Sequence, residues 1–68
     1  MISEDEKFFV VEGMTKQGGA FVKGIGTALM SADHVNRAKI KATWPEYWSE
    51  YLEIGKKLNP QVAANKEE

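Results

Sequence analysis

The sequence predicts a small all-α protein, a bundle of three to four helices in a single domain. Two stretches, residues 19–31 and 45–58, repeat apolar side chains three and four positions apart, which is the spacing of helical rows. Capping residues and prolines separate these stretches and mark where helices begin and end. With 68 residues the chain has the length of one domain with a modest core. We expect the helical domain to cover residues 1–58 and a flexible tail to follow at 59–68.

Composition restricts the classes of function. The chain has no cysteine and one histidine, so neither a disulfide framework nor a thiolate or histidine metal cluster is available to it. Its formal net charge is −1, but residues 1–12 carry four acids against one lysine, whereas residues 13–64 carry seven bases against four acids. The acidic start does not resemble a signal peptide, and no apolar run reaches the roughly 18 residues of a membrane span. We therefore expect a soluble cytoplasmic protein with no membrane partner and no cofactor.

The first helix is expected at residues 4–16. Ser3 and Glu6 form a capping-box pattern, and the acids of the first turn suit the positive end of a helix dipole. Residues 8–11 have strand preference, and Gly13 costs about 1 kcal/mol inside a helix, so a strand stays open as the alternative for this segment. We favour the helix because a lone strand would have no partner in a chain whose remaining pattern is helical.

The helix expected at residues 19–31 is the central one, because three of its four rows are apolar or small. The row of large residues is Phe21, Ile25 and Leu29, and the row of small residues is Ala20, Gly24, Ala28 and Ala32. A row of small residues allows another helix to approach closely, so we expect a tight helix contact at Gly24. Because one apolar face remains after the other helices are covered, we also expect a homodimer formed through this helix; the competing explanation is that the N-terminal segment at residues 8–11 covers this face instead.

The third helix is expected at residues 34–43. The stretch Ser31-Ala32-Asp33 supplies the N-cap candidates, and the i,i+4 spacing of Asp33 to Arg37 supports an ion pair. The residues expected on the inner face are Val35, Ala38 and Ala42, with Ile40 flanking the core. Joined to the central helix by a short turn, this helix has the proportions of a helix-turn-helix with an exposed basic side. Its candidate nucleic-acid contacts are Asn36, Arg37, Lys39 and Lys41.

The stretch from Trp44 to Tyr51 contains both tryptophans and both tyrosines of the chain. Proline suits the first helical turn, so Pro45 predicts the start of a helix at residues 45–58, with Trp44 at the preceding corner. Most of such an aromatic set is expected in the core, and part of it suits a docking surface, since interfaces are enriched in Tyr and Trp. The residues of the expected protein interface are Ala20, Gly24, Ala28, Tyr47 and Tyr51.

Motifs for catalysis are weak. Gly19 and Gly24 have part of the spacing of a phosphate-binding loop, but the lysine and hydroxyl residue that should follow are missing. His34 is expected to be a surface histidine, because no thiol nucleophile exists for it to activate. The carboxylates within residues 46–53 lack the Glu-x-x-His partners of a helical di-metal site, so we expect a solvated face. The sequence therefore predicts a non-enzymatic protein without catalytic, cofactor or metal residues.

Three segments carry a resemblance: FVK at residues 21–23, VNRAKIK at 35–41, and PEYW with a further tyrosine at 45–51. Over about residues 18–58 the chain resembles short uncharacterised accessory proteins of phages and prophages. The resemblance implies a protein of the bacterial host cytoplasm that binds and modulates a host protein, for instance as an inhibitor of a defence system. The alternative, taken from the residues alone, is a small helix-turn-helix-like regulator that binds nucleic acid.

Overall fold

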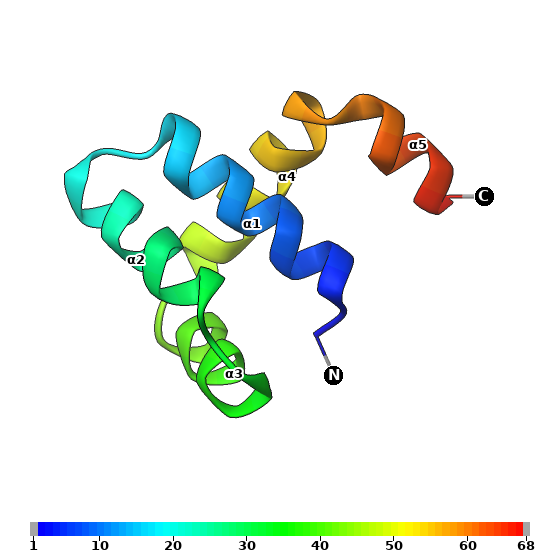
Figure 1. Ribbon diagram of the computed structural model, residues 1–68. Helices are drawn as coiled ribbons and strands as arrows, with labels where there is room; N and C mark the ends of the chain where they lie inside the picture. Colours follow the sequence, from blue (N-terminus) through cyan, green and yellow to red (C-terminus); the bar gives the residue numbers. More distant parts are fainter. Residues whose placement is uncertain (1, 68) are drawn as a thin grey trace.

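The structure of the protein is a computed structural model that describes residues 2–67. These residues form five helices and no strand, so the all-α prediction is confirmed and the strand alternative near the N-terminus is wrong. The helices are α1 (Glu4–Gln17), α2 (Ala20–Met30), α3 (His34–Thr43), α4 (Pro45–Leu58) and α5 (Pro60–Glu67). Figure 1 shows α1 and α4 crossing in the middle of the molecule, with α2 alongside α1 and α3 at one end.

Helix α1 begins where the sequence predicts. The Ser3 side chain accepts a hydrogen bond of 3.1 Å from the backbone N–H of Glu6, and acids fill the first turn. The strand-preferring residues of α1 are helical because one side of the helix faces the core, where Phe9, Val10 and Met14 are buried. Burial in the tertiary structure therefore outweighs local strand preference.

Helices α1 and α4 meet backbone to backbone at Gly13 and Gly55, in the most extensive contact between any two helices. A Cβ atom added to Gly13 would overlap the carbonyl oxygen of Tyr51, and one added to Gly55 would overlap the carbonyl group of Phe9. Only glycine leaves room for so close a crossing. This contact explains why Gly13 occurs inside α1 although it lowers helix propensity by about 1 kcal/mol.

Helix α2 packs on α1 through one face. Its buried residues are Val22, Ile25, Gly26 and Leu29. The close approach falls at Gly26, where an added Cβ would lie 2.9 Å from the Cβ of Met14, whereas nothing lies within 4 Å of the same position at Gly24. The prediction of a tight contact at Gly24 is therefore wrong within the chain. Ala20, Gly24 and Ala28 face solvent because the larger apolar side chains on the opposite side of α2 drive the packing.

Helix α3 begins at one of the predicted N-cap candidates, since the Asp33 side chain accepts a hydrogen bond of 2.9 Å from the backbone N–H of Asn36. The face that it turns toward the rest of the molecule differs from the prediction, because Arg37 lies on that side, next to Ile40, which packs against the core as expected. The residues expected there are exposed: Val35, Ala38 and Ala42. The inner face is thus rotated, and its centre is an arginine instead of an alanine.

Arg37 is the one buried charged side chain among the residues that the structure describes. Its guanidinium forms an ion pair of 3.0 Å with Glu4 and donates a hydrogen bond of 3.3 Å to the carbonyl oxygen of Ile2. The ion pair predicted with Asp33 is therefore replaced by one between α3 and α1. The Nε of Arg37 is buried without a partner, so the net gain from these contacts is smaller than their geometry implies.

Trp48 of α4 is the largest fully buried side chain and is only 1% exposed. Its indole N–H donates a hydrogen bond of 2.7 Å to a carboxylate oxygen of Glu6, and the Lys41 ammonium donates one of 3.0 Å to the same oxygen. Burial raises the pKa of Glu6, but the hydrogen bonds from Lys41 and Trp48 and the nearby lysine charges outweigh it and leave the pKa below its ordinary value. One carboxylate on α1 thus ties together α3 and α4.

The corner between α3 and α4 lies at Trp44 and Pro45, as predicted. Trp44 has φ −129° and ψ 63°, and Pro45 opens α4. Asn59 has nearly the same geometry, with φ −131° and ψ 59°, and Pro60 opens α5. Residues 60–67 are therefore helical, whereas the sequence predicts a flexible tail at residues 59–68. Both prolines begin a helix because their fixed φ suits the first turn, in which the missing N–H needs no partner.

Substitution of two glycines separates packing from helix propensity. Gly55→Ala should lower the free energy of unfolding by about 1–3 kcal/mol, because overpacking at the helix crossing outweighs the gain in propensity. Gly24→Ala should raise it by about 0.5–1 kcal/mol, because space around Gly24 is open. Urea unfolding followed by circular dichroism measures both changes. Shifts of the same sign and size would contradict the close crossing of α1 and α4.

The contacts of Glu6 predict sensitivity to acid. Its pKa is lower in the folded chain, so its stabilising contribution is complete above the ordinary value of 4.5 and is lost as the pH falls through the folded value. We expect Glu6→Gln to lower the free energy of unfolding by about 1 kcal/mol at about pH 7 and by much less at about pH 3.5. Urea titrations at both pH values measure this, with the exposed Glu50→Gln as control. A Glu6→Gln effect independent of pH would refute the prediction.

Candidate functional site

Four aromatic side chains of α2, the α3–α4 corner and α4 form a continuous group, which we call the aromatic surface: Phe21, Trp44, Tyr47 and Tyr51. The Phe21 ring lies edge-on to Trp44 at 6.0 Å between ring centres and 6.4 Å from Tyr47. Tyr47 in turn lies 6.4 Å from Tyr51. Phe21 is 61% exposed, and the other three side chains are half-buried. The rings therefore support one another while part of each remains open to solvent.

Local structure places these rings. Trp44 closes α3 by donating its backbone N–H to the Ile40 carbonyl at 3.0 Å, and its own carbonyl accepts the N–H of Trp48 at 2.9 Å. Tyr47 and Tyr51 are one helical turn apart and therefore share one side of α4. Trp48 points from another side of the same helix into the core. Anchoring α4 through Trp48 thus leaves the two tyrosines at the surface.

The exposed small residues of α2 border the aromatic surface. Gly24 and Ala28 follow Phe21 by three and seven positions, which places the three residues on one face of the helix. Ala20 lies one turn before Gly24 and is exposed as well. The structure thus brings the residues expected in a protein interface to one side of the molecule: Ala20, Gly24, Ala28, Tyr47 and Tyr51.

Phe21 is exposed, although the sequence places it in one row of large apolar residues with Ile25 and Leu29, and such a row predicts burial. The observed exposures are 0% for Leu29, 7% for Ile25 and 61% for Phe21. At 3.6 residues per turn, a step of four residues rotates the side chain by about 40° beyond a full turn. The row therefore drifts out of the core toward its N-terminal end. The spacing of Phe21 to Gly24 and Ala28 is the sequence signal that could have placed it correctly.

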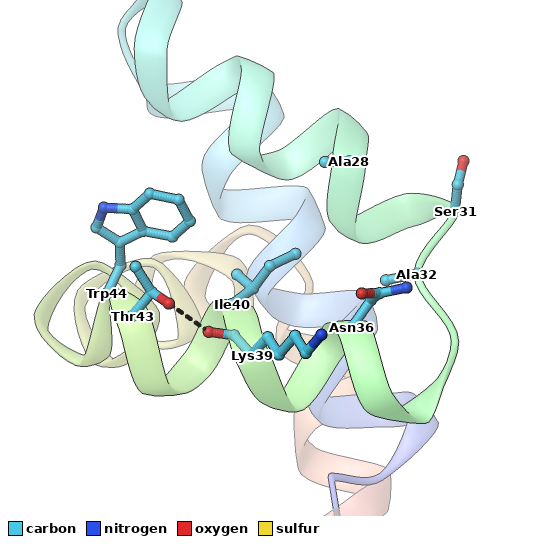
Figure 2. Close-up of a pocket in the computed structure, with 8 residues that line it drawn as sticks. All are labelled: Ala28, Ser31, Ala32, Asn36, Lys39, Ile40, Thr43 and Trp44. Carbon is cyan, nitrogen blue, oxygen red and sulfur yellow. Dashed lines mark hydrogen bonds between the residues drawn. The ribbon is translucent and has the colours of Figure 1, made fainter.

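A groove of about 320 Å³ lies between α2 and α3, next to Trp44. Figure 2 shows Ile40 pointing from α3 toward α2, with Ala28 on the facing side and Trp44 at one end. Asn36 and Lys39 lie along its outer edge. The groove therefore combines an apolar floor with a polar rim and continues the aromatic surface through Trp44.

The four candidate nucleic-acid contacts of α3 separate into two pairs. Asn36 and Lys39 are exposed and line the groove. Arg37 is buried and pairs with Glu4, and Lys41 forms an ion pair of 3.0 Å with Glu6. Both carboxylates belong to the first turn of α1. The expected exposure of Arg37 is therefore wrong. Two of the four candidate side chains of α3 therefore form ion pairs within the protein, because the acidic first turn of α1 lies next to them.

The histidine of α3 and the carboxylates of α4 lie at the surface. His34 is exposed in the first turn of α3, and the carboxylates at residues 46, 50 and 53 are exposed along α4. In the part of the chain that the structure describes, no three His, Asp or Glu side chains are grouped as metal ligands would be. Over residues 2–67, no helix combines the length and the apolar content that a membrane crossing requires.

Comparisons of the chain with protein-family models, with curated proteins and with solved structures give no match. The similarity to short phage and prophage proteins stays an expectation from the sequence. Function is therefore inferred from the aromatic surface, the groove and the charges around them.

Proposed function

We propose that the protein is a non-enzymatic accessory protein that binds and modulates a host protein through its aromatic surface. The observation that carries this proposal is the exposure of Phe21, which is 61% open to solvent although it contacts two other rings. Apolar area left in water contributes nothing to the stability of so small a domain. Docking of a partner would remove this area from water, and this is the role that we assign to the aromatic surface.

The chemistry of the aromatic surface favours a protein as the partner. Tyrosine and tryptophan are enriched in protein interfaces because they bury a large area at a small cost in side-chain entropy. The hydroxyl groups of Tyr47 and Tyr51 have no hydrogen-bond partner within the described residues and are available to a bound protein. The rings stand on α2 and α4, whose other faces are anchored in the core, so little freedom is lost on binding.

The proposed partner is a protein of the bacterial host cytoplasm. This part of the proposal rests on the resemblance of residues 18–58 to phage and prophage accessory proteins. Complexes of bacterial defence systems are the first class of partner to test, with the protein acting as their inhibitor. No cofactor and no membrane enter the proposed mechanism, in which the protein acts by occupying a surface of its partner.

Nucleic-acid binding through α3 is the alternative function. Of its four candidate contacts, only Asn36 and Lys39 are exposed and have side-chain polar groups without an internal partner among the described residues. Binding to a phosphate backbone usually draws on several free cations on one face. We therefore treat nucleic acid as a possible outcome of the experiment below.

Capture from a nuclease-treated bacterial lysate tests the proposed function. We expect the tagged protein to retain a specific host protein, and Phe21→Ser to reduce that capture about tenfold or more, as loss of a central aromatic contact does. Phe8→Ser is the matched control, because Phe8 is also an exposed ring, at 41%, but lies on α1 outside the aromatic surface. Circular dichroism verifies that both variants remain folded. Capture that needs intact nucleic acid, or that ignores Phe21→Ser, would contradict the proposal.

The homodimer expected from the sequence is also part of the proposal. The exposed row of Ala20, Gly24 and Ala28 lets a second α2 approach closely. Light scattering at about tens of micromolar should give about twice the 7.6 kDa mass of one chain. Gly24→Arg should restore the single mass without loss of helix, because its site is open and an unpaired charge at a desolvated interface is unfavourable. A mass of 7.6 kDa for the unaltered protein would rule the dimer out.

A further inference from the structure

The groove between α2 and α3 indicates which kind of segment the partner protein would insert into it. We infer that the groove binds an acidic peptide segment of the partner: an apolar side chain enters against Ile40 and Trp44, and a carboxylate within one helical turn of it pairs with Lys39. This inference rests on the proposed function, because it names the chemistry of the bound protein.

The groove exists because the residues that face α3 from α2 and from the turn after it are small. Ala28 and Ala32 present only methyl groups to it, whereas Ile40 reaches across from α3 (Figure 2). Trp44 lies at the end next to the aromatic surface. The volume of about 320 Å³ is at the small end of the range of about 300–1,000 Å³ for ligand sites. The groove therefore has room for one or two side chains.

The floor of the groove is apolar and partly open to water. Ile40 and Trp44 are half-buried, and Ala28 is exposed. An aromatic or branched aliphatic side chain placed between them would remove apolar surface from water on both sides of the contact. Because Trp44 belongs both to the groove and to the aromatic surface, one partner can cover the two without a gap.

The rim of the groove carries a positive charge that the protein does not neutralise. Lys7 donates a hydrogen bond to the Ala32 carbonyl, and three further lysines have carboxylate partners: Lys16, Lys41 and Lys56. The ammonium group of Lys39 has no partner within the described residues, and no acidic side chain lines the groove. The side-chain amide of Asn36, on the same rim, is also without a hydrogen bond there. A carboxylate from the partner complements this rim.

The spacing of these features favours a helical peptide. Lys39 precedes Trp44, the C-cap of α3, by five positions, which corresponds to about 7.5 Å at the rise of an α-helix. Two residues of a bound helix at i and i+4 are about 6 Å apart along its own axis, so an apolar anchor and an acid one turn away reach both positions. One free lysine suits a single carboxylate better than a nucleic-acid backbone, which needs several cations.

Selection of displayed peptides tests the inference. A random peptide library on yeast is selected against the folded full chain and counter-selected against Ala28→Leu, whose larger side chain fills the groove at an exposed position. We expect the enriched peptides to share an aromatic or branched aliphatic residue with Asp or Glu three or four positions away. Unfolding by urea confirms that Ala28→Leu is folded before it is used.

A charge exchange with the best selected peptide gives the sharper measurement. Lys39→Glu should weaken its binding about fivefold or more, and changing the acid of the peptide to lysine should restore binding to Lys39→Glu. Lys57→Glu is the matched control, because Lys57 is also exposed without an internal partner but lies on α4 outside the groove. This control should leave binding within about twofold.

Several results would overturn the inference: no enrichment, enrichment without an acid, or equal effects of Lys39→Glu and Lys57→Glu. A dimer that Lys39→Glu converts to a monomer would also overturn it, because a second copy would then occupy the groove. Lysate capture that depends on Phe21 but not on Lys39 would reject the groove and keep the proposed function. Loss of lysate capture together with successful charge exchange would reject the host-protein proposal and keep the peptide site.

Discussion

The close crossing of α1 and α4 is the contact on which the rest of the structure depends. Gly13 lies one turn after Phe9, and Gly55 lies two turns after Trp48, so each glycine shares its helix face with a large buried side chain. The missing side chains at the crossing let these large residues pack deeply on either side of it. A chain of 68 residues buries a smaller share of its surface on folding than a larger domain does, so such close packing matters for its stability. The crossing also decides which side of α4 is left at the surface for its tyrosines.

The acidic first turn of α1 determines how α3 is held and which of its charges remain free. Glu4 pairs with Arg37, and Glu6 accepts hydrogen bonds from Lys41 and Trp48, so two basic residues of α3 turn toward α1. Direct packing of α3 on α2 is sparse, because the facing residues of α2 and of the turn after it are small. The same arrangement therefore explains both the open groove and the single free lysine on its rim. The sequence predicts a broadly basic face on α3. In the structure, the part of this face that lines the groove carries one cation, Lys39, beside an apolar floor.

Local chemistry was sufficient to predict the helices. Ser3 and Asp33 accept the capping hydrogen bonds that their positions indicate, and Pro45 opens α4 after a corner at Trp44. These signals act within one helical turn and need no knowledge of the partner helix. Pro60 repeats the signal of Pro45 and opens α5, so the same argument applied there would have predicted a helix in place of a flexible tail.

The candidate site was predictable in part. Sequence alone identified the small residues of α2 and the tyrosines of α4, because helical spacing shows which residues share a face. Only the tertiary structure decided how those faces are turned: Gly26 and not Gly24 meets α1, Arg37 is buried, and Phe21 is exposed. Each of these outcomes depends on which element lies opposite, and hence on residues far away in the chain. The groove beside Lys39 has the same origin, since it forms between two helices and belongs to neither.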